Sequence, residues 1–274
     1  MKVERDVAGA RAAGASLPRP LGFVPTMGAL HAGHVALVSA ARAECRAVAV
    51  SLYVNPLQFG AGEDFERYPR DFERDRAQFA AAGADLLFVP DTAMMLPVGY
   101  STYVDVGPMA DRFEGARRPG HFRGVATVVA KLLDIMRPDV LYLGQKDAQQ
   151  TAVVRRMVRD LEIGVDVRIV PTVRDADGVA LSSRNAYLSK DERHAAPSLH
   201  AMLQRVCDLM ENGIDKGSAI SQAGRMLSPP GTLEYLDVVD ADSFEPIETL
   251  RPPAFIIAAA RLGKTRLLDN LWIH

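Results

Sequence analysis

The sequence predicts an α/β protein: a Rossmann-like, doubly wound parallel sheet followed by a smaller C-terminal α+β domain. In the first two-thirds of the chain, short apolar segments alternate with helical patterns, which is typical of βαβ units in a parallel sheet. After residue 173 the alternation stops, and helices are followed by extended segments, which favours an antiparallel sheet. We therefore predict one domain over residues 1–173 and a second over residues 174–274.

The strands predicted for the first domain are short and almost wholly apolar, as expected of parallel strands that are buried on both faces. They cover residues 21–24, 47–53, 85–89, 139–143 and 165–170. Apolar residues at helical spacing predict the intervening helices over residues 33–46, 70–82, 124–136 and 147–161. In such sheets ligands bind outside the carboxyl ends of the strands, where the strand order reverses.

The second domain opens with turn and capping patterns. Asp177-Gly178 predicts a turn between two extended segments. Ser189 and Glu192 form the Ser-x-x-Glu pattern of a capping box, which opens a helix. Two helices, broken near Gly213, then precede extended segments at residues 234–239, 255–259 and 266–268.

Composition excludes several classes of protein. A net charge of −2 gives no general electrostatic footprint for nucleic acid. No segment approaches the roughly 20 apolar residues of a membrane-spanning helix, and residues 1–6 lack the apolar core of a signal peptide. Cys45 and Cys207 are too few for a disulfide framework. We expect a cytoplasmic protein with neither nucleic acid nor membrane as a partner.

The most informative pattern is a pair of histidines at the start of the helix after the first predicted strand. His31 and His34 are three residues apart and therefore lie on one helix face. Free N–H groups and the helix dipole favour an anion there, and Gly28 and Gly33 let a ligand approach the main chain. The pattern predicts a phosphate site. A partial metal site and ordinary helix-start residues are the alternatives.

Two further clusters favour a nucleotide triphosphate as the anion. Gly-Gln-Lys-Asp at residues 144–147 follows a strand, so Lys146 can reach phosphates and Asp147 can accept ribose hydroxyls. Ser-Ser-Arg at residues 182–184 lies near the domain junction, where the fork of Arg184 matches phosphate oxygens. Residues 114–120, with His121 beside them, have two interpretations. The segment either contacts a phosphate or another subunit, or it is a solvated loop.

Together these motifs resemble the pantoate–β-alanine ligase family (the pantothenate synthetases), within the wider His-x-Gly-His nucleotidyltransferase superfamily. The resemblance covers nearly the whole chain. It rests on Pro25–His31, Val54–Phe59, Tyr68–Arg70, His121–Val125, Gly144–Gln150 and Ser182–Asn185. The glutamine-bearing segments are the most specific, because the broader superfamily shares the histidines but not the glutamines.

The resemblance implies an ATP-dependent ligase that joins pantoate to β-alanine through a pantoyl adenylate and releases AMP and pyrophosphate. It implies ATP, pantoate and β-alanine as substrates, Mg²⁺ bound mainly to ATP, and a homodimer. The first domain would bind ATP and pantoate, and the second would act as a lid. Another His-x-Gly-His nucleotidyltransferase, or a module that binds ATP without consuming it, is the alternative.

The resemblance also implies residue roles. The catalytic residues would be His31, His34, Lys146 and Arg184. The ATP-binding residues would be Met27, His34, Gly144, Lys146, Asp147, Val173, Leu181, Ser182, Ser183 and Arg184. Pantoate would contact Pro25, Met27, Gln58 and Gln150, and Asn55 and Tyr68 would complete the pocket. Asp75 and Gln78 match positions near the magnesium ion.

Three positions depart from the family pattern. Leu181 replaces a common methionine, Ala148 a common aromatic residue, and Gln145 a common glutamate. Leucine nearly conserves the volume of methionine, so the adenine pocket should survive, whereas Ala148 would loosen local packing. Neither of these two changes removes a catalytic donor. Adenylation needs no general base, because a carboxylate is already ionised at neutral pH. A lid that excludes water would protect the adenylate, and residues 60–70 are the candidate.

Overall fold

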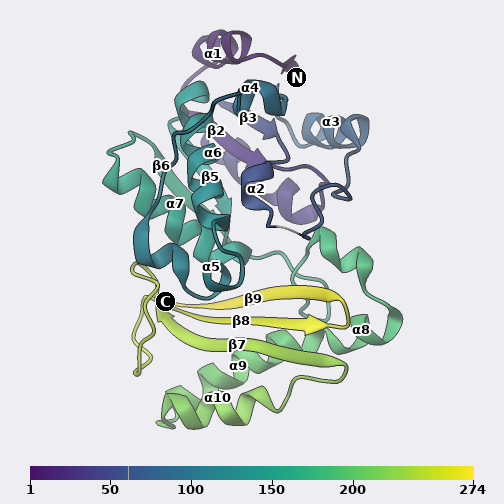
Figure 1. Ribbon diagram of the computed structural model, residues 1–274, viewed down its shortest axis with the longest axis vertical. Coiled ribbons are helices and arrows are strands. Elements are labelled where there is room, and N and C mark those ends of the chain that lie inside the picture. The colour runs from purple at the N-terminus through teal and green to yellow at the C-terminus, as the bar shows by residue number, and fades with distance from the viewer. Residues whose placement is uncertain (61) are drawn as a thin grey trace. The chain divides into compact units, whose positions relative to one another are not determined.

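The computed structural model describes residues 1–60 and 62–274, which form two compact units. Unit 1 comprises Met1–Gly144 and Val153–Val170, and unit 2 comprises Gln145–Ala152 and Pro171–His274. Most helices and strands of both units are labelled in Figure 1. A parallel sheet in unit 1 and a smaller antiparallel sheet in unit 2 confirm the predicted fold class.

Unit 1 is built on six parallel strands, in the order β1 (Lys2–Glu4), β4 (Leu86–Phe88), β3 (Ala47–Leu52), β2 (Leu21–Thr26), β5 (Val140–Gly144) and β6 (Asp166–Val170). β2 pairs with β3 on one side and with β5 on the other. The strand order therefore reverses at β2, and the segment that carries both histidines leaves the sheet at this switch point.

Helices cover the sheet of unit 1. They are α1 (Val7–Ser16), α2 (Ala32–Glu44), α3 (Phe72–Ala81) and α6 (His121–Met136), with the short α4 (Thr92–Met95) and α5 (Glu114–Arg117). α2 and α3 share an apolar cluster with the sheet, to which Val24, Val38 and Phe79 belong. α1 packs against α6. α7 (Ala148–Asp160) begins in unit 2 and ends in unit 1.

The predicted strands and helices of the first two-thirds are all present, with ends displaced by at most three residues. β1 and α1 lie in a segment for which the sequence analysis proposes no element. α1 is rich in alanine and glycine, which gives a weak amphipathic pattern. Asp6 caps it by accepting a hydrogen bond from the Gly9 N–H (2.8 Å).

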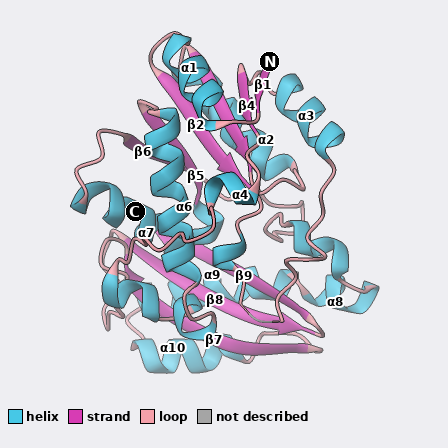
Figure 2. Ribbon diagram, turned by 45° about the horizontal axis from the view of Figure 1, so that its top comes forward, coloured by secondary structure: helices cyan, strands magenta, loops and turns pink. Residues whose placement is uncertain are grey.

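Unit 2 is a three-stranded antiparallel sheet with helices packed on it, as Figure 2 shows. Its strands are β7 (Gly231–Asp240), β8 (Ala254–Leu262) and β9 (Thr265–Ile273), and its helices are α8 (Lys190–Ala195), α9 (Pro197–Glu211) and α10 (Lys216–Gly224). The predicted capping box of Ser189 and Glu192 is present at the start of α8. α9 packs on β8 and β9, and α10 packs on β7.

The two compact units differ from the predicted division at residue 173 in one functional respect. Residues 145–152, which include Lys146 and Gln150, belong to unit 2, although the strand before them belongs to unit 1. Sequence patterns hide this division, because a strand and the turn after it are adjacent along the chain. Within the described residues, no helix is both long and apolar enough to cross a membrane.

Candidate active site

The segment between β2 and α2 adopts a conformation that depends on glycine. Gly28 has a φ of +87°, and a Cβ at this position would come within 2.7 Å of the Asp75 carboxylate and 2.9 Å of Leu52. Ala29 also has a positive φ, of +53°. The backbone therefore turns sharply immediately before the two histidines, and the tight space beside Gly28 fixes where that turn lies.

Asp75 of α3 holds this turn in place. Its side chain is 1% exposed, and its two carboxylate oxygens accept hydrogen bonds from the N–H groups of Ala29 and Leu30, at 3.0 Å each. Two buried backbone donors are thus paired by one charged acceptor, a strong type of hydrogen bond. The structure gives Asp75 an anchoring role that the sequence analysis missed. Its predicted place near a magnesium ion, with Gln78, stays a prediction.

His31 and His34 form a capping box at the start of α2. Nδ1 of His31 accepts from the Gly33 N–H (3.1 Å), and Nδ1 of His34 accepts from the His31 N–H (3.3 Å). The ring centroids are 4.2 Å apart. An accepting Nδ1 leaves the proton of a neutral imidazole on Nε2. Both rings therefore carry an Nε2–H donor, and the capping role of these residues is compatible with anion binding.

Two predicted pocket residues of unit 1, Asn55 and Gln58, follow β3 and lie beside Met27, which follows β2. Asn55 is 2% exposed and donates from Nδ2 to Oε1 of Gln58 and to the Gly124 carbonyl, both at 3.1 Å. The Gln58 amide in turn lies 3.1 Å from Sδ of Met27. A Cβ at Gly124 would come within 2.3 Å of the Leu57 carbonyl oxygen. α6 therefore approaches the turn that carries Gln58 as closely as a glycine permits.

The same turn is held by side chains at the start of α6. Nδ1 of His121 donates to the Gln58 carbonyl (2.8 Å), and Arg118 donates to the same oxygen (3.1 Å) and to Nε2 of His121 (3.1 Å). Arg118 also forms a two-point ion pair with Glu63, at 2.6 and 2.7 Å. Arg118 and His121 thus brace the Gln58 turn, a use that neither interpretation of residues 114–120 included.

These contacts set the protonation of the group. Burial, with the charge of Arg118 next to it, lowers the pKa of His121 from 6.5 to about 4, so the imidazole is neutral at pH 7. Burial alone would raise the pKa of the Glu63 carboxyl, but the hydrogen bonds and charge of Arg118 hold it below its ordinary value. Glu63 lies within residues 60–70, the predicted lid, in which Ala61 is outside the described residues.

In unit 2, several of the predicted ATP residues lie on or next to two short turns. Lys146 and Asp147 lie on η3 (Gln145–Asp147), with Nζ of the lysine 3.3 Å from Oδ1 of the aspartate. The second turn is η4 (Ser183–Tyr187), which Ser182 caps by accepting from the Arg184 N–H (3.3 Å). β9 packs against both turns, so one strand supports both groups of residues.

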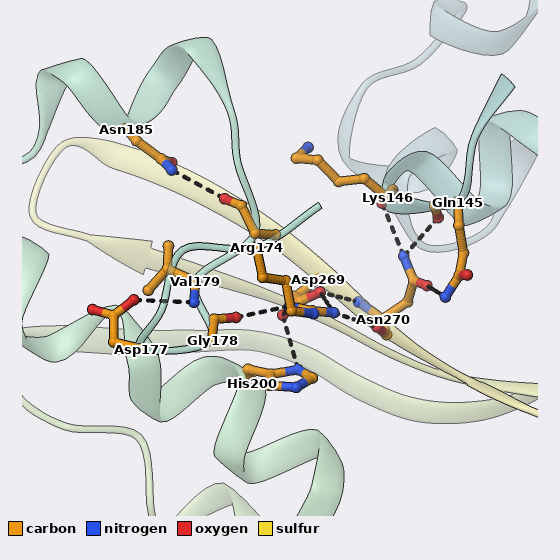
Figure 3. Close-up of polar contacts among 11 residues, drawn as sticks. Gln145, Lys146, Arg174, Asp177, Gly178, Val179, Asn185, His200, Asp269 and Asn270 are labelled. Atoms are coloured by element: carbon orange, nitrogen blue, oxygen red, sulfur yellow. Dashed lines mark hydrogen bonds and ion pairs between the residues drawn. The ribbon is translucent and has the colours of Figure 1, made fainter. Parts of the chain in front are cut away.

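A buried polar network lies in the middle of β9 (Figure 3). Asp269 is 4% exposed and receives two hydrogen bonds from Arg174, at 2.7 and 2.8 Å. Nδ1 of His200 lies 3.4 Å from the same carboxylate. Burial alone would raise the pKa of Asp269, but His200 and Arg174 hold it below its ordinary value. Arg174 also donates to the Gly178 carbonyl (3.0 Å), at the predicted Asp-Gly turn.

The other predicted residues are placed as follows. Pro25 and Met27 follow one another closely at the end of β2, and Tyr68 is buried edge-on to Phe59, with ring centroids 6.0 Å apart. In unit 2, the half-buried residues are Gln150, Val173, Leu181, Ser182, Ser183 and Arg184. Asn270 and Asp269 were missed, although two adjacent polar residues inside an apolar strand are a recognisable pattern.

Comparison with known proteins decides the family. The pantoate–β-alanine ligase family model matches residues 2–272. The chain belongs to the pantoate–β-alanine ligase family. It is 51% identical to the pantothenate synthetase of Heliobacterium modesticaldum, over 93% of this chain and 92% of that protein. It is 50% identical to that of Rhizorhabdus wittichii, over 99% and 96%. The predicted resemblance is confirmed.

Solved structures agree with this membership. The crystal structure of pantothenate synthetase from Thermus thermophilus has a TM-score of 0.94 and 48% identity to this chain, and 99% of each chain is covered. A ligase from Francisella tularensis, in complex with βγ-ATP and β-alanine, has a TM-score of 0.80 and 33% identity, with 99% of this chain and 97% of that chain covered. The prediction of a pantoate–β-alanine ligase is therefore confirmed over the alternative nucleotidyltransferase.

Proposed function

We propose that this ligase activates pantoate as a pantoyl adenylate and then transfers the pantoyl group to β-alanine. Family membership across residues 2–272 carries the proposal. The capping box of His31 and His34 supports it, because it presents two Nε2–H donors at the positive end of a helix.

In the first step the pantoate carboxylate attacks the α-phosphorus of ATP, and pyrophosphate leaves. The nucleophile is ionised at neutral pH, so catalysis consists of positioning and of stabilising charge on the phosphate oxygens. His31 and His34 would donate to those oxygens through Nε2–H. Lys146 and Arg184 would balance the charge that develops on the departing pyrophosphate.

The remaining ATP contacts follow the family pattern. Ser182 and Ser183 would donate hydroxyl hydrogen bonds to phosphate oxygens, and Asp147 and Gly144 would contact the ribose. Met27, Val173 and Leu181 would complete the nucleotide site. The position of Lys146 and Asp147 supports these separate roles for phosphate and ribose. The Lys146 side chain is 22% exposed, and its ammonium lies 3.3 Å from the Asp147 carboxylate, which is at the surface.

Pantoate would be selected by amides. The hydroxyl and carboxylate groups of an acid of this kind require both donors and acceptors, which Gln58 and Gln150 supply. Asn55 orients Gln58 by donating to its Oε1, so the Gln58 amide N–H₂ is directed toward Met27. Pro25 and Met27 would provide apolar contact, and Tyr68 would close the part of the pocket that receives the amine.

We also propose that Mg²⁺ accompanies ATP and is held mainly by phosphate oxygens. Among the described residues there is no group of three or more His, Cys, Asp or Glu side chains that fits a metal ion. Magnesium ions that accompany nucleotides commonly keep several waters and touch the protein through one or two groups. Asp75 and Gln78 are the proposed contacts, through water, because both oxygens of Asp75 already accept from backbone N–H groups. The ion would neutralise charge on the leaving pyrophosphate.

For the assembly and location we propose a cytoplasmic homodimer without nucleic acid or membrane partners. The homodimer rests on the family resemblance. The small net charge of −2 supports the exclusion of nucleic acid. Light scattering of the purified protein tests the dimer, since a single mass of one chain would exclude it.

The decisive experiment is exchange of labelled pyrophosphate into ATP. We expect exchange to require pantoate and AMP release to require β-alanine as well. His34→Ala and Lys146→Ala should each lose about 10²–10³-fold in the exchange rate, or roughly 2.7–4 kcal/mol of transition-state stabilisation. Exchange that proceeds equally well without pantoate, or wild-type rates in both variants, would exclude the proposed mechanism.

A further inference from the structure

Asn270 has a hydrogen-bonding pattern that matches the turn carrying Lys146. Its side chain is 2% exposed, and its Nδ2 donates to two successive carbonyls, those of Gln145 and Lys146, both at 2.9 Å. Carbonyl oxygens only accept, so the nitrogen of the amide must face them. Figure 3 shows the Lys146 side chain extending away from Asn270, while its carbonyl faces the amide.

The third polar site of the same amide is also used. With both N–H hydrogens directed at carbonyls, Oδ1 of Asn270 needs a donor, and Nε2 of Gln145 lies 3.2 Å from it. A glutamate at position 145 could not donate there as a carboxylate. Gln145, one of the departures from the family pattern, is therefore matched to Asn270: the two amides satisfy each other around the backbone of η3.

The part of β9 that carries Asn270 is itself held by hydrogen bonds. The Asn270 N–H donates to Oδ1 of Asp269 (2.7 Å), and Arg174 donates both to that carboxylate and to the Asn270 carbonyl (3.1 Å). Arg174 bridges to Ala180, just before the Leu181–Arg184 segment. The network thus joins η3 and the approach to η4 through buried bonds, and buried bonds of this kind hold a geometry closely.

We propose that Asn270 is a positioning residue for Lys146: by holding the carbonyls of Gln145 and Lys146, it fixes where the ammonium meets the ATP phosphates. This inference rests on the proposed role of Lys146. Gln145 supports Asn270 by donating to its Oδ1. The Asp269–Arg174 pair holds the part of β9 from which Asn270 projects. None of the residues that support Lys146 touches substrate in this proposal.

The test compares Asn270→Asp with Lys146→Ala and with the double variant, in pantoate-dependent pyrophosphate exchange. The aspartate is isosteric but has no donor and opposes two carbonyl oxygens with a negative charge. Displacing a catalytic group by about 1 Å costs on the order of 10²-fold. We expect a loss of that order in kcat/KM for ATP, with the KM for pantoate unchanged.

The double variant separates positioning from general damage. If Asn270 acts through Lys146, adding Asn270→Asp to Lys146→Ala should cost less than about twofold more, because residues acting as a unit are non-additive. If the losses in exchange rate of the two single variants multiply in full in the double variant, the proposal is overturned. Wild-type exchange in Asn270→Asp, beside an impaired Lys146→Ala, would overturn it alone. Wild-type exchange in Lys146→Ala would remove the proposed function and this inference together.

Two further variants guard against loss of folding. Gln145→Glu removes the donor to Oδ1 of Asn270 and places a carboxylate oxygen against it. This variant should lose about tenfold, again suppressed in the Lys146→Ala background. Leu267→Ala, in the apolar cluster of unit 2 and on the same strand, is the matched control. It should lower the Tm while leaving the KM for ATP unchanged. Fluorescence of Trp272, the only tryptophan of the chain, reports whether this strand is folded.

Discussion

The two units hold their proposed catalytic segments by opposite chemistry. In unit 1 the carboxylate of Asp75 accepts from two successive N–H groups, those of Ala29 and Leu30, just before the histidine pair. In unit 2 the amide of Asn270 donates to two successive carbonyls at Lys146. Both segments run from a parallel strand into a helix. The difference lies in which backbone groups each turn leaves without a partner: N–H groups at Ala29 and Leu30, and carbonyls at Gln145 and Lys146.

A second difference lies in the polar groups that brace a turn of the candidate site in each unit. The unit 2 anchor rests on a buried ion pair between Arg174 and Asp269. In unit 1 the Gln58 turn is braced by a neutral His121 next to Arg118. The unit 2 support depends on a charge that persists in mild acid, and the unit 1 support depends on an uncharged ring. The two units should therefore respond differently to mutation and to pH.

Breaking the buried ion pair should have the strongest consequence. Arg174→Met keeps the apolar stem but leaves the Asp269 carboxylate buried without its guanidinium, which should cost roughly 3–5 kcal/mol of unfolding free energy. Denaturant titration followed by Trp272 fluorescence measures it. Arg193→Met, which breaks ion pairs with the exposed Asp175 and Asp177, is the control and should cost about 1 kcal/mol or less. Equal losses in both variants would remove the distinction between the pairs.

The corresponding test in unit 1 concerns Asp75. Asp75→Asn replaces one acceptor with an N–H₂ group, so one buried backbone N–H of Ala29 or Leu30 loses its partner, at a cost of about 1–3 kcal/mol. Hydrogen exchange at residues 26–34 should accelerate, and pyrophosphate exchange should fall with it. Asp71→Asn, at the exposed cap of α3, is the matched control and should leave both unchanged, because asparagine caps as well as aspartate. Unaltered protection of residues 26–34 in Asp75→Asn would contradict the anchoring role.

A weaker effect concerns pH. The pKa of His121 is about 4 in the folded chain and 6.5 when unfolded, so the unfolded chain binds a proton first as the pH falls. The contribution of neutral His121 to the free energy of unfolding is complete above pH 6.5 and is lost between about pH 6.5 and 4. Between about pH 7 and 5 the wild type should lose about 2 kcal/mol more than His121→Asn, which retains a donor to the Gln58 carbonyl but does not titrate. Parallel pH profiles of the two proteins would exclude this role for His121.

The order of the elements and the family could be predicted from the amino-acid sequence. Apolar runs located the strands, and helical spacing located the helices, because burial requires those periods whatever the neighbours. The histidine pair and the glutamine-bearing runs identified the ligase family. Capping patterns such as Ser189 with Glu192 also followed from sequence, since a cap is satisfied within four residues.

What holds the site residues in place could be found only in the folded chain. Asp75 is 46 residues from Ala29, and Asn270 is 124 residues from Lys146, so local patterns carry no record of either contact. The assignment of residues 145–152 to unit 2 likewise depends on contacts with residues far along the chain, which local patterns do not record. A buried polar side chain is selected by the backbone groups that remain unpaired around it, and those groups become neighbours only when the chain has folded.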